Sequence, residues 1–367
     1  MKVAIVLNTS WNIYNFRMGL IKALREDGHE IHTVAPVDDY TAFLVEAGCI
    51  HHSLTMDSRG VNPIKDLALT FELFGIYRKF RPDVILHFTI KPNVYGTLAA
   101  SVLQIPTINN VCGLGTIFLK KGVTSRVAKW LYRASFRFAT RVFFQNSDDR
   151  AIFLEEKLIA PGIADLVPGS GIDLSRFQPV EFKRNKTFTF LLVSRLITDK
   201  GILEFVEAIQ QLRAEGMDAR FQVLGAKDPS DTRGISASII DSWIATNTIE
   251  YLGTTQDVRP FMEQADCIVL PSYREGAPRT LLEAASLGKP IVTTDVPGCH
   301  HVVEHEFNGL LCEVKSGKDL AAKMKQMASC SDETLLAFGR NGRKKMEAEF
   351  DEVHVIRKYR QGLRALA

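Results

Sequence analysis

The sequence lacks the cysteine patterns that mark secreted or metal-binding domains. Its 367 residues include six cysteines, which form no CxxC pair and no evenly spaced framework. Disulfide-rich domains and zinc sites need such spacing, so we expect reduced thiols, a cytoplasmic setting and no metal site built from them. No apolar run approaches the ~18 residues of a membrane-spanning helix. The opening run MKVAIVLN is too short for a signal peptide and predicts a first β-strand.

Two motifs for cofactors are missing as well. The first strand continues into NTSWNIYNF, without the glycine fingerprint of dinucleotide-binding domains. This absence argues against an NAD-dependent oxidoreductase. The sequence has no Asp-x-Asp motif that could hold a metal beside a nucleotide. We therefore expect neither a metal nor another cofactor.

Acidic residues are absent from a long part of the first half. Residues 84–147 contain no aspartate or glutamate but eight lysines and arginines. Four of these cations recur at helical spacing and form one stripe: Arg126, Lys129, Arg133 and Arg137. The apolar stripe beside them includes Trp130, and such a helix is typical of peripheral contact with an anionic membrane, here the inner face of the cell membrane. A core-packed helix with a solvated basic face is the alternative, and no motif for reading nucleic acid accompanies the charges.

Strand and helix patterns alternate along the whole chain. Five apolar runs from KVAIVL to RVFFQN and six from TFTFLLVS to GLLCEV are separated by amphipathic stretches. This α/β alternation predicts two doubly wound, Rossmann-like domains with parallel sheets and an interdomain cleft. The expected boundaries are 1–166 for the N-terminal domain, 167–180 for a linker rich in Gly, Pro and Ser, 181–345 for the C-terminal domain and 346–367 for a helix that returns to the N-terminal domain.

The most informative loop residues follow strands of the second half. Arg195 and Lys200 precede the helix ILEFVEAIQQLRAEG, and two cations at a helix N-terminus favour a diphosphate. Glu275 lies in the loop after DCIVLPS, and Glu283 follows in EGAPRTLLE. A nucleotide needs cations for its phosphates and a carboxylate for its ribose, so these residues together predict a nucleotide site. Surface pairing of the cations with acids such as Asp199 is the alternative.

These motifs resemble those of the family 4 retaining glycosyltransferases, which have the GT-B architecture of two facing Rossmann-like domains. The resemblance covers nearly the whole chain and is carried by SRLITDKG and by EGAPRTLLE with the following EAASLGKPIVTTDVPGCHHVVEHEFNGLL. It implies that Glu283 binds the ribose of a nucleotide sugar and that Glu275 binds a hydroxyl of the donor sugar. Further donor contacts are expected at Gly276, Ala277, Pro278, Arg279, Thr280, Gly225, Gly113 and Gly115. Proline has no amide hydrogen, so near Pro278 the neighbouring amides would contact the donor.

The first half is similar to a narrower bacterial branch that extends undecaprenyl-diphosphate-linked sugars. SWNIYNFRMGLIKAL, HFTIKPNVYGTLAA, NNVCGLGTIF and FFQNSDD carry this similarity, which is greatest to α-1,3-N-acetylgalactosaminyltransferases that use UDP-GalNAc. It implies a polyprenyl-diphosphate-linked saccharide as the acceptor, in surface polysaccharide or glycan assembly. Arg17, Lys91 and Asn93 of the acceptor-binding N-terminal domain are the expected acceptor contacts.

One position departs from the family pattern. Many members carry a histidine where this sequence has Cys112. A neutral thiol is a poor proton acceptor and a weak hydrogen-bond donor, so the role of that histidine is absent or moved. His87 lies inside an apolar strand, where a satisfied core histidine is expected.

The predicted reaction is a retaining transfer without an enzyme nucleophile. Arg195 and Lys200 would stabilise the charge that develops on the UDP β-phosphate, with Glu275 as the third catalytic residue. As the resemblance implies, the departing phosphate would take the proton of the acceptor hydroxyl. The alternatives are a transferase that uses another UDP-hexose, a non-catalytic nucleotide-sugar-binding protein, and a glycosidase, which needs two carboxylates but no paired cations.

Overall fold

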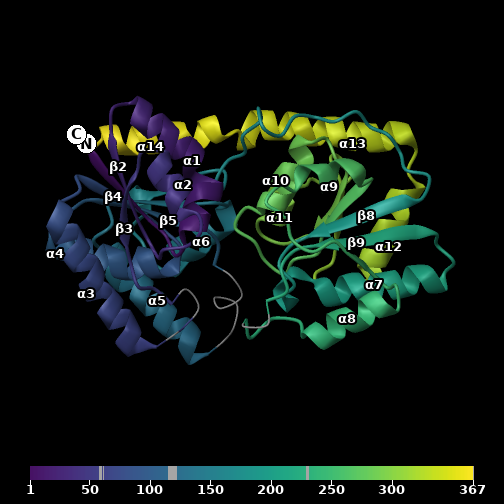
Figure 1. Ribbon diagram of the computed structural model, residues 1–367, viewed down its shortest axis with the longest axis horizontal. Helices are drawn as coiled ribbons and strands as arrows, with labels where there is room; N and C mark the ends of the chain where they lie inside the picture. Colours follow the sequence, from purple (N-terminus) through teal and green to yellow (C-terminus); the bar gives the residue numbers. More distant parts are fainter. Residues whose placement is uncertain (58–59, 61, 115–121, 229–230, 367) are drawn as a thin grey trace. The chain divides into compact units, whose positions relative to one another are not determined.

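The computed structural model describes residues 1–57, 60, 62–114, 122–228 and 231–366 (Figure 1). The chain divides into two compact units, Met1–Gly171 with Glu352–Ala367 (unit 1) and Ile172–Asp351 (unit 2). The first division falls within the predicted linker, and the second falls within the predicted C-terminal segment. Within the described ranges, no helix combines the length and the apolar character that crossing a membrane would require.

Unit 1 contains a parallel sheet of seven strands in the order β3-β2-β1-β4-β5-β6-β7. Its register places Ile5 of β1 opposite Thr33 of β2 and Leu86 of β4. The elements of unit 1 are β1 Lys2–Val6, α1 Ser10–Glu26, β2 Glu30–Ala35, α2 Thr41–Glu46, β3 Ile50–Ser53, α3 Pro63–Phe80, β4 Val84–Phe88, the π-helix η1 Pro92–Gly96, α4 Thr97–Val102, β5 Thr107–Val111, α5 Val123–Phe136, β6 Arg141–Phe144, α6 Ser147–Glu155, the 3-10 turn η3 Pro161–Ile163, β7 Ala164–Leu166 and α14 Glu352–Arg364.

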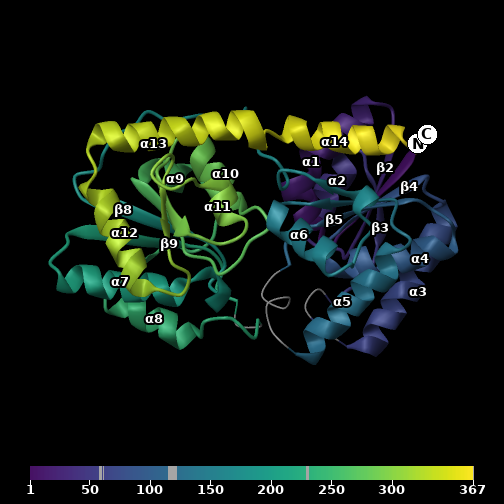
Figure 2. The same cartoon turned by 180° about the vertical axis from the view of Figure 1, so that it is seen from behind.

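Helices cover both faces of the unit 1 sheet because alternate strand residues point to opposite sides. Val3 and Ile5 of β1 pack on the side of α1 and α14, whereas Ala4 and Val6 pack on the side of α3. Figures 1 and 2 show α14 lying beside α1. An ion pair fastens the two helices, since Arg360 Nε lies 2.6 Å from Asp27 Oδ2.

Unit 2 contains a parallel sheet of six strands in the order β10-β9-β8-β11-β12-β13. All six apolar runs predicted for this half form strands of this sheet. The elements of unit 2 are β8 Phe188–Val193, the 3-10 turn η4 Thr198–Lys200, α7 Ile202–Ala214, β9 Ala219–Leu224, α8 Ala237–Ala245, β10 Glu250–Tyr251, α9 Arg259–Gln264, β11 Cys267–Leu270, α10 Arg279–Ser286, β12 Ile291–Thr294, α11 Cys299–Val302, β13 Leu310–Cys312, α12 Gly317–Ser329, α13 Asp332–Lys345 and the π-helix η5 Met346–Phe350.

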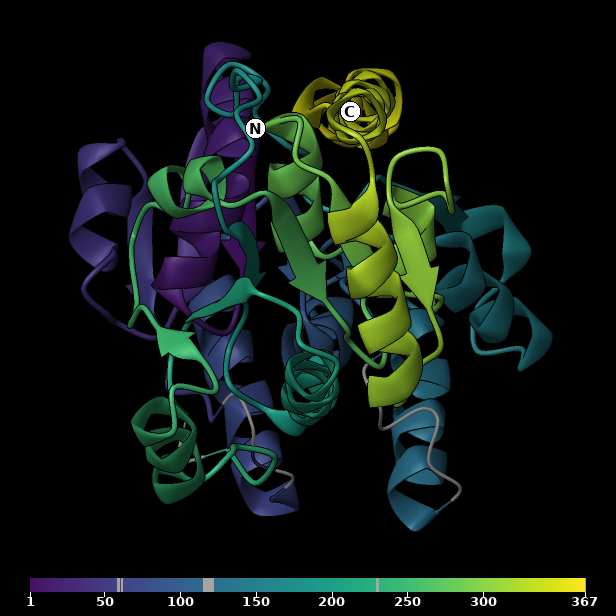
Figure 3. The same cartoon turned by 90° about the vertical axis from the view of Figure 1, so that its right-hand side faces the viewer.

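The unit 2 sheet separates two apolar layers. Phe190 and Leu192 of β8 belong to the layer of α7 and α12, and Leu191 and Val193 belong to the layer of α10. Helices α7 and α12 pack against each other on one face (Figure 3). In each unit the strand order reverses beside the first strand, next to β1 in unit 1 and β8 in unit 2. Ligands of doubly wound sheets bind beyond the carboxyl ends of the strands at this position.

Candidate functional site

Three loops meet beyond the carboxyl ends of the adjacent strands β9, β8 and β11. The loop after β8 carries Arg195 and Lys200, the loop after β9 carries Arg233, and the loop after β11 carries Glu275. Backbone hydrogen bonds join the first two loops, because Thr198 N donates to Arg233 O at 2.8 Å. The site therefore lies where the strand order of unit 2 reverses.

Two glycines let these loops approach closely. Gly201 has φ +72°, and a Cβ there would lie 2.0 Å from the carbonyl oxygen of Pro271. Gly225 has φ +152°, and a Cβ there would lie 1.8 Å from the carbonyl oxygen of Ser194. A larger residue at either position would push apart two of the strand ends that form the site.

Lys200 and Glu275, predicted from separate motifs, form an ion pair between the β8 and β11 loops. The Glu275 loop is fixed from the other side, because Glu275 N donates to Pro297 O at 3.1 Å. The cation predicted to bind phosphate and the carboxylate predicted to bind a donor-sugar hydroxyl thus lie side by side. The alternative of pairing with acids is met in part, because Lys200 is hydrogen-bonded to Glu275 and Arg195 lies within ion-pair distance of Asp228 and Asp231.

Arg195 is held more loosely than Lys200. Its Nη1 lies 3.8 Å from Asp228 Oδ2 and 3.7 Å from Asp231 Oδ2, and its side chain is 47% exposed. Both distances exceed a normal hydrogen bond, so these contacts restrain the guanidinium weakly.

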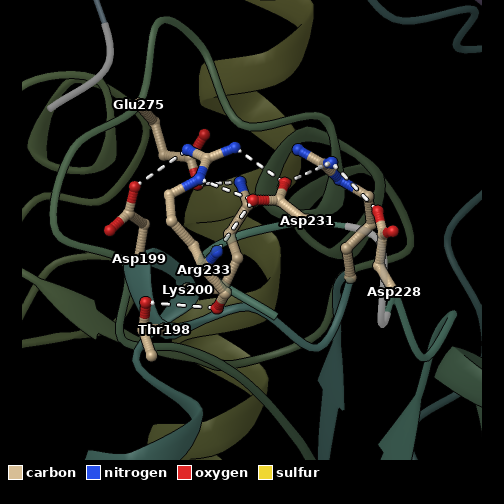
Figure 4. Close-up of polar contacts among 8 residues, drawn as sticks. Thr198, Asp199, Lys200, Asp228, Asp231, Arg233 and Glu275 are labelled. Atoms are coloured by element: carbon tan, nitrogen blue, oxygen red, sulfur yellow. Dashed lines mark hydrogen bonds and ion pairs between the residues drawn. The ribbon is translucent and has the colours of Figure 1, made fainter. Parts of the chain in front are cut away.

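Arg233 is the best-anchored cation of the cluster, and the sequence interpretation missed it. Its Nε and Nη2 donate to the two carboxylate oxygens of Asp231 at 3.0 and 2.9 Å, and its Nη1 donates to Asp199 at 3.0 Å (Figure 4). The hydrogen bond to Asp231 raises the pKa of Arg233. The sequence feature that could have indicated Arg233 is the cluster of charged residues in KDPSDTRG, soon after a predicted strand.

Glu283 lies on α10, near the same end of the sheet. Thr280 Oγ1 donates to Val193 O at 3.0 Å and so fastens the helix to the last residue of β8. Arg279 Nε donates to Glu283 Oε1 at 2.9 Å. Burial raises the pKa of Glu283 despite this arginine, whose charge and hydrogen bond act in the opposite direction.

The turn between Glu275 and α10 holds the other predicted donor contacts of unit 2. Gly276 and Pro278 are buried, and Pro278 is the N-cap residue of α10. Ala277 between them is partly exposed. In unit 1, Gly113 follows β5 with φ +122°. Gly115 lies outside the described residues.

Arg17 lies over the end of β4 in unit 1. It is 5% exposed, and its Cζ lies 4.2 Å from the centre of the Phe88 ring. Its Nη2 lies 3.9 Å from Cys112 Sγ, and its buried Nε has no hydrogen-bond partner among the described residues. A buried guanidinium beside a thiol and an aromatic ring is suited to binding an anion.

The other two predicted acceptor contacts are already engaged inside unit 1. Lys91 Nζ lies 2.7 Å from Asp66 Oδ1, and Tyr95 donates to the second oxygen of this carboxylate at 2.9 Å. Asn93 is fully buried and donates to Asn110 O at 2.8 Å. Of the three residues, Arg17 is therefore the best placed to bind an anionic group of an acceptor.

His87 is a satisfied core histidine, as predicted from its apolar strand. It is fully buried, with Nε2 3.0 Å from the Tyr77 hydroxyl and Nδ1 2.9 Å from Asn109 Oδ1. Burial lowers its pKa to about 3. It therefore does not replace the family histidine at Cys112.

The basic stripe lies mainly on α5, as its spacing predicts, with Arg137 as the C-cap residue. Lys129 Nζ lies 2.6 Å from Glu156 Oε1, and Arg133 donates to the carbonyl oxygens of Glu156 and Lys157. Arg126 and Arg137 are exposed, and Trp130 between them is 65% exposed. The stripe thus combines two cations bound to the end of α6 with two on the surface.

Models of two domain families match the chain, one described as glycosyl transferases group 1 over residues 175–345 and one described as glycosyl transferase 4-like over residues 2–146. The chain is a glycosyltransferase of the GT-B fold. The crystal structure of Anabaena Alr3699/HepE in complex with UDP and glucose has the same fold, with a TM-score of 0.80, 18% identity and 99% coverage of both chains.

Two relatives match this glycosyltransferase over most of their length. N,N'-diacetylbacillosaminyl-diphospho-undecaprenol alpha-1,3-N-acetylgalactosaminyltransferase of Campylobacter jejuni is 29% identical over 341 residues, 88% of each chain. UDP-Gal:alpha-D-GlcNAc-diphosphoundecaprenol alpha-1,3-galactosyltransferase of Escherichia coli is 26% identical over 336 residues, 88% of this chain and 83% of the relative.

Proposed function

We propose that the protein transfers a hexosamine, GalNAc, from a UDP-sugar to an undecaprenyl-diphosphate-linked saccharide, with retention, during assembly of a surface polysaccharide or glycan. The observation that carries the proposal is the pairing of Lys200 with Glu275 at the strand-order reversal of unit 2. It puts a cation for the leaving diphosphate next to a carboxylate for donor-sugar hydroxyls. The Campylobacter jejuni relative, an undecaprenol-linked N-acetylgalactosaminyltransferase by name, supports the choice of substrates.

The chemistry follows from charge development on the leaving group. As the glycosidic bond breaks, negative charge builds on the β-phosphate, and Arg195 and Lys200 stabilise it, an effect worth roughly 10² to 10³-fold in rate per donor. Glu283 accepts hydrogen bonds from the ribose, and the departing phosphate takes the proton of the acceptor hydroxyl. Arg17 binds the acceptor diphosphate, because its buried Nε has no hydrogen-bond partner among the described residues. The residues named in these steps act without a metal ion.

We further propose that unit 1 docks on the anionic inner face of the cell membrane. Helix α5 exposes Val123, Val127 and Trp130 together with its cations. A second apolar stripe, absent from the sequence interpretation, is exposed on α3: Ile64, Leu67 and Phe71, with Ile64 80% exposed. Both helices reach the same edge of unit 1 (Figures 1 and 3). Apolar side chains flanked by cations suit the lipid headgroup region.

Acceptor-dependent release of UDP tests the reaction class. With UDP-GalNAc as donor, we expect UDP release to increase when a short-chain polyprenyl-diphosphate-linked amino sugar is added. A glycosidase would instead hydrolyse a glycoside in water without any nucleotide, and a non-catalytic binding protein would bind UDP but release none. A transferase for another UDP-hexose is the second candidate, favoured by the name of the Escherichia coli galactosyltransferase relative.

A further inference from the structure

Two arginines compete for one buried carboxylate beside the proposed diphosphate site. The side chain of Asp231 is 3% exposed, and its Oδ2 lies 2.9 Å from Arg233 Nη2 but 3.7 Å from Arg195 Nη1. A third hydrogen bond, from Arg233 N to Asp231 Oδ1 at 3.0 Å, completes the hold of Arg233 on this carboxylate. Arg195 is therefore the second partner of an acid that Arg233 already satisfies.

The charge balance of the cluster makes this competition matter. Three cations, Arg195, Lys200 and Arg233, face four carboxylates: Asp199, Asp228, Asp231 and Glu275. Figure 4 shows Arg233 between Asp199 and Asp231, with the Lys200–Glu275 pair beside it. A bound diphosphate would bring further negative charge to described ion pairs in which each of these three cations already has an acid within ion-pair distance. Its binding depends on how many cations the acids leave available.

We propose that Arg233 is a positioning residue that keeps Arg195 available for the diphosphate. The inference rests on the proposed function, since it concerns the same donor site. Arg233 satisfies Asp231 with two side-chain hydrogen bonds and also reaches Asp199, whereas Arg195 stays beyond hydrogen-bond distance of Asp231 and keeps its exposure. Arg233 thus acts through the acids and need not touch the donor.

Loss of the Arg233 charge has a defined consequence. Without the Arg233 side chain, the buried Asp231 would keep the backbone hydrogen bond from residue 233 but lose its bidentate cation, so it would draw the nearest other cation into a direct pair. That cation is Arg195, which needs to move by only about 1 Å to reach the ~2.8 Å of a charge-assisted hydrogen bond. Arg195 would then be bound to an acid instead of the diphosphate. Removing the carboxylate as well should release it.

A double-mutant cycle on UDP affinity tests the proposal. We expect Arg233→Gln to weaken UDP binding, measured by calorimetry on the full chain, about tenfold, the effect of losing one charged hydrogen bond. The double variant Arg233→Gln/Asp231→Asn should recover affinity to within about threefold of the wild type, because no ionised carboxylate remains at position 231 to capture Arg195. The donor KM should follow the same pattern.

The matched control is Arg220→Gln. Arg220 forms a similar two-point contact with Glu250, at 2.9 and 2.8 Å, but lies near the amino end of β9, at the opposite end of the sheet. The Arg220→Gln variant should therefore bind UDP with the affinity of the wild type. Thermal unfolding of each variant checks that unit 2 folds. If Arg233→Gln does not fold, Arg233→Lys, which keeps the charge, takes its place. Arg233→Lys should bind UDP better than any variant that removes the charge.

Two results would overturn the inference: unchanged UDP affinity in Arg233→Gln, or a double variant that binds UDP as weakly as Arg233→Gln alone. The second result would mean that Arg233 contacts the ligand or only supports the loop. Failure of the proposed function looks different, because the wild-type protein itself would then release no UDP from UDP-GalNAc when the acceptor is added, whatever the UDP affinities of the variants.

Discussion

Arg195 and Lys200 are the residues on which the proposed chemistry depends most. We expect Arg195→Ala and Lys200→Ala each to lower kcat by ~10²-fold or more, because each removes a charge aimed at the leaving phosphate. Lys200→Ala also leaves Glu275 without its ion-pair partner, so its donor KM should rise as well. Steady-state kinetics with the fold checked by circular dichroism measures both effects. Wild-type turnover in both variants would remove the diphosphate assignment.

Glu283 gives the site a pH dependence. Burial raises its pKa, so without ligand this carboxyl keeps its proton to a higher pH than an ordinary glutamate does. Ribose hydroxyls donate hydrogen bonds to the ionised form. UDP affinity should therefore increase as the pH rises through the raised pKa of Glu283, and it should be lower at pH values below this pKa. Calorimetry across pH 5 to 8 measures the slope.

Glu283→Gln is the control for this titration. The amide cannot ionise, so the part of the slope that belongs to Glu283 should vanish, while that from the titration of UDP itself should persist. The variant should also bind UDP about 1.5 to 3 kcal/mol more weakly at high pH, the usual loss for a hydrogen bond to a charged group. Parallel pH profiles for both proteins would exclude Glu283 from the ribose site.

The sequence was informative about single residues only where a motif fixed them. Arg195, Lys200 and Glu275 were predicted because they follow strand ends that the hydrophobic pattern marks, and Glu283 was predicted because it belongs to the EGAPRTLLE motif. The role of Arg233 could not be predicted from the sequence, because its contacts join loops that follow different strands. Likewise, no local pattern indicates that Lys91 is neutralised from α3 by Asp66.

At the scale of elements, helix α5 carries the testable part of the membrane proposal. Changing Arg126, Lys129, Arg133 and Arg137 to glutamine should release the protein from anionic vesicles, since each cation near the surface adds about 1 kcal/mol to binding at low salt. Turnover on a short-chain, water-soluble acceptor should stay nearly intact. Vesicle flotation at increasing anionic lipid content is the measurement.

The contacts of α5 supply a control for this experiment. Lys129 and Arg133 also hold the end of α6, so their loss changes packing as well as charge. The double variant Arg126→Gln/Arg137→Gln changes only exposed residues and should give about half of the effect. Identical flotation of wild type and quadruple variant at every lipid composition would mean that the stripe is only a solvated face.

Elements with strong apolar patterns were predictable, and weak ones were not. All six strands of unit 2 correspond to predicted runs, mainly because buried parallel strands such as β8 and β11 are nearly continuous in apolar residues. In unit 1, β3 and β7 were missed. They are the two edge strands, and their sequences IHHS and ADL are too short and too polar to form an apolar run.

At the scale of the whole molecule, we expect acid to destabilise unit 1. Burial lowers the pKa of His51, lowers that of His52 from 6.5 to about 4 and lowers that of His87 from 6.5 to about 3. The folded form thus favours the neutral rings, while the unfolded chain takes up protons near pH 6.5. The stability that depends on these histidines is complete well above pH 6.5 and is lost as the pH falls toward about 4 for His52 and about 3 for His87.

Hydrogen exchange followed by mass spectrometry, corrected for the intrinsic pH dependence of exchange, measures this loss. Between pH 7 and pH 5, protection should decrease in β2, β3 and β4, which carry or adjoin these histidines. The partly exposed His51 and His52 contribute less than His87. His52→Asn should reduce the acid sensitivity of the β2–β3 edge. Equal protection at both pH values throughout unit 1 would contradict the prediction.

The two-unit organisation could be predicted, whereas the substrate could not be worked out from physics. Apolar runs separated by amphipathic stretches indicate two doubly wound sheets, and the structure has both. No spacing or composition distinguishes one hexose from another. The proposal of GalNAc therefore rests on similarity, and the donor needs the most direct test.

That test is a competition among donors with the mass of the product as readout. The full-length protein is incubated with a mixture of UDP-GalNAc, UDP-GlcNAc, UDP-galactose and UDP-glucose and a short-chain polyprenyl-diphosphate-linked amino sugar. We expect one product, heavier than the acceptor by one N-acetylhexosamine, that also forms when UDP-GalNAc is the only donor and does not form when UDP-GlcNAc is the only donor. A product heavier by a plain hexose, or no product while UDP still binds, would contradict this expectation.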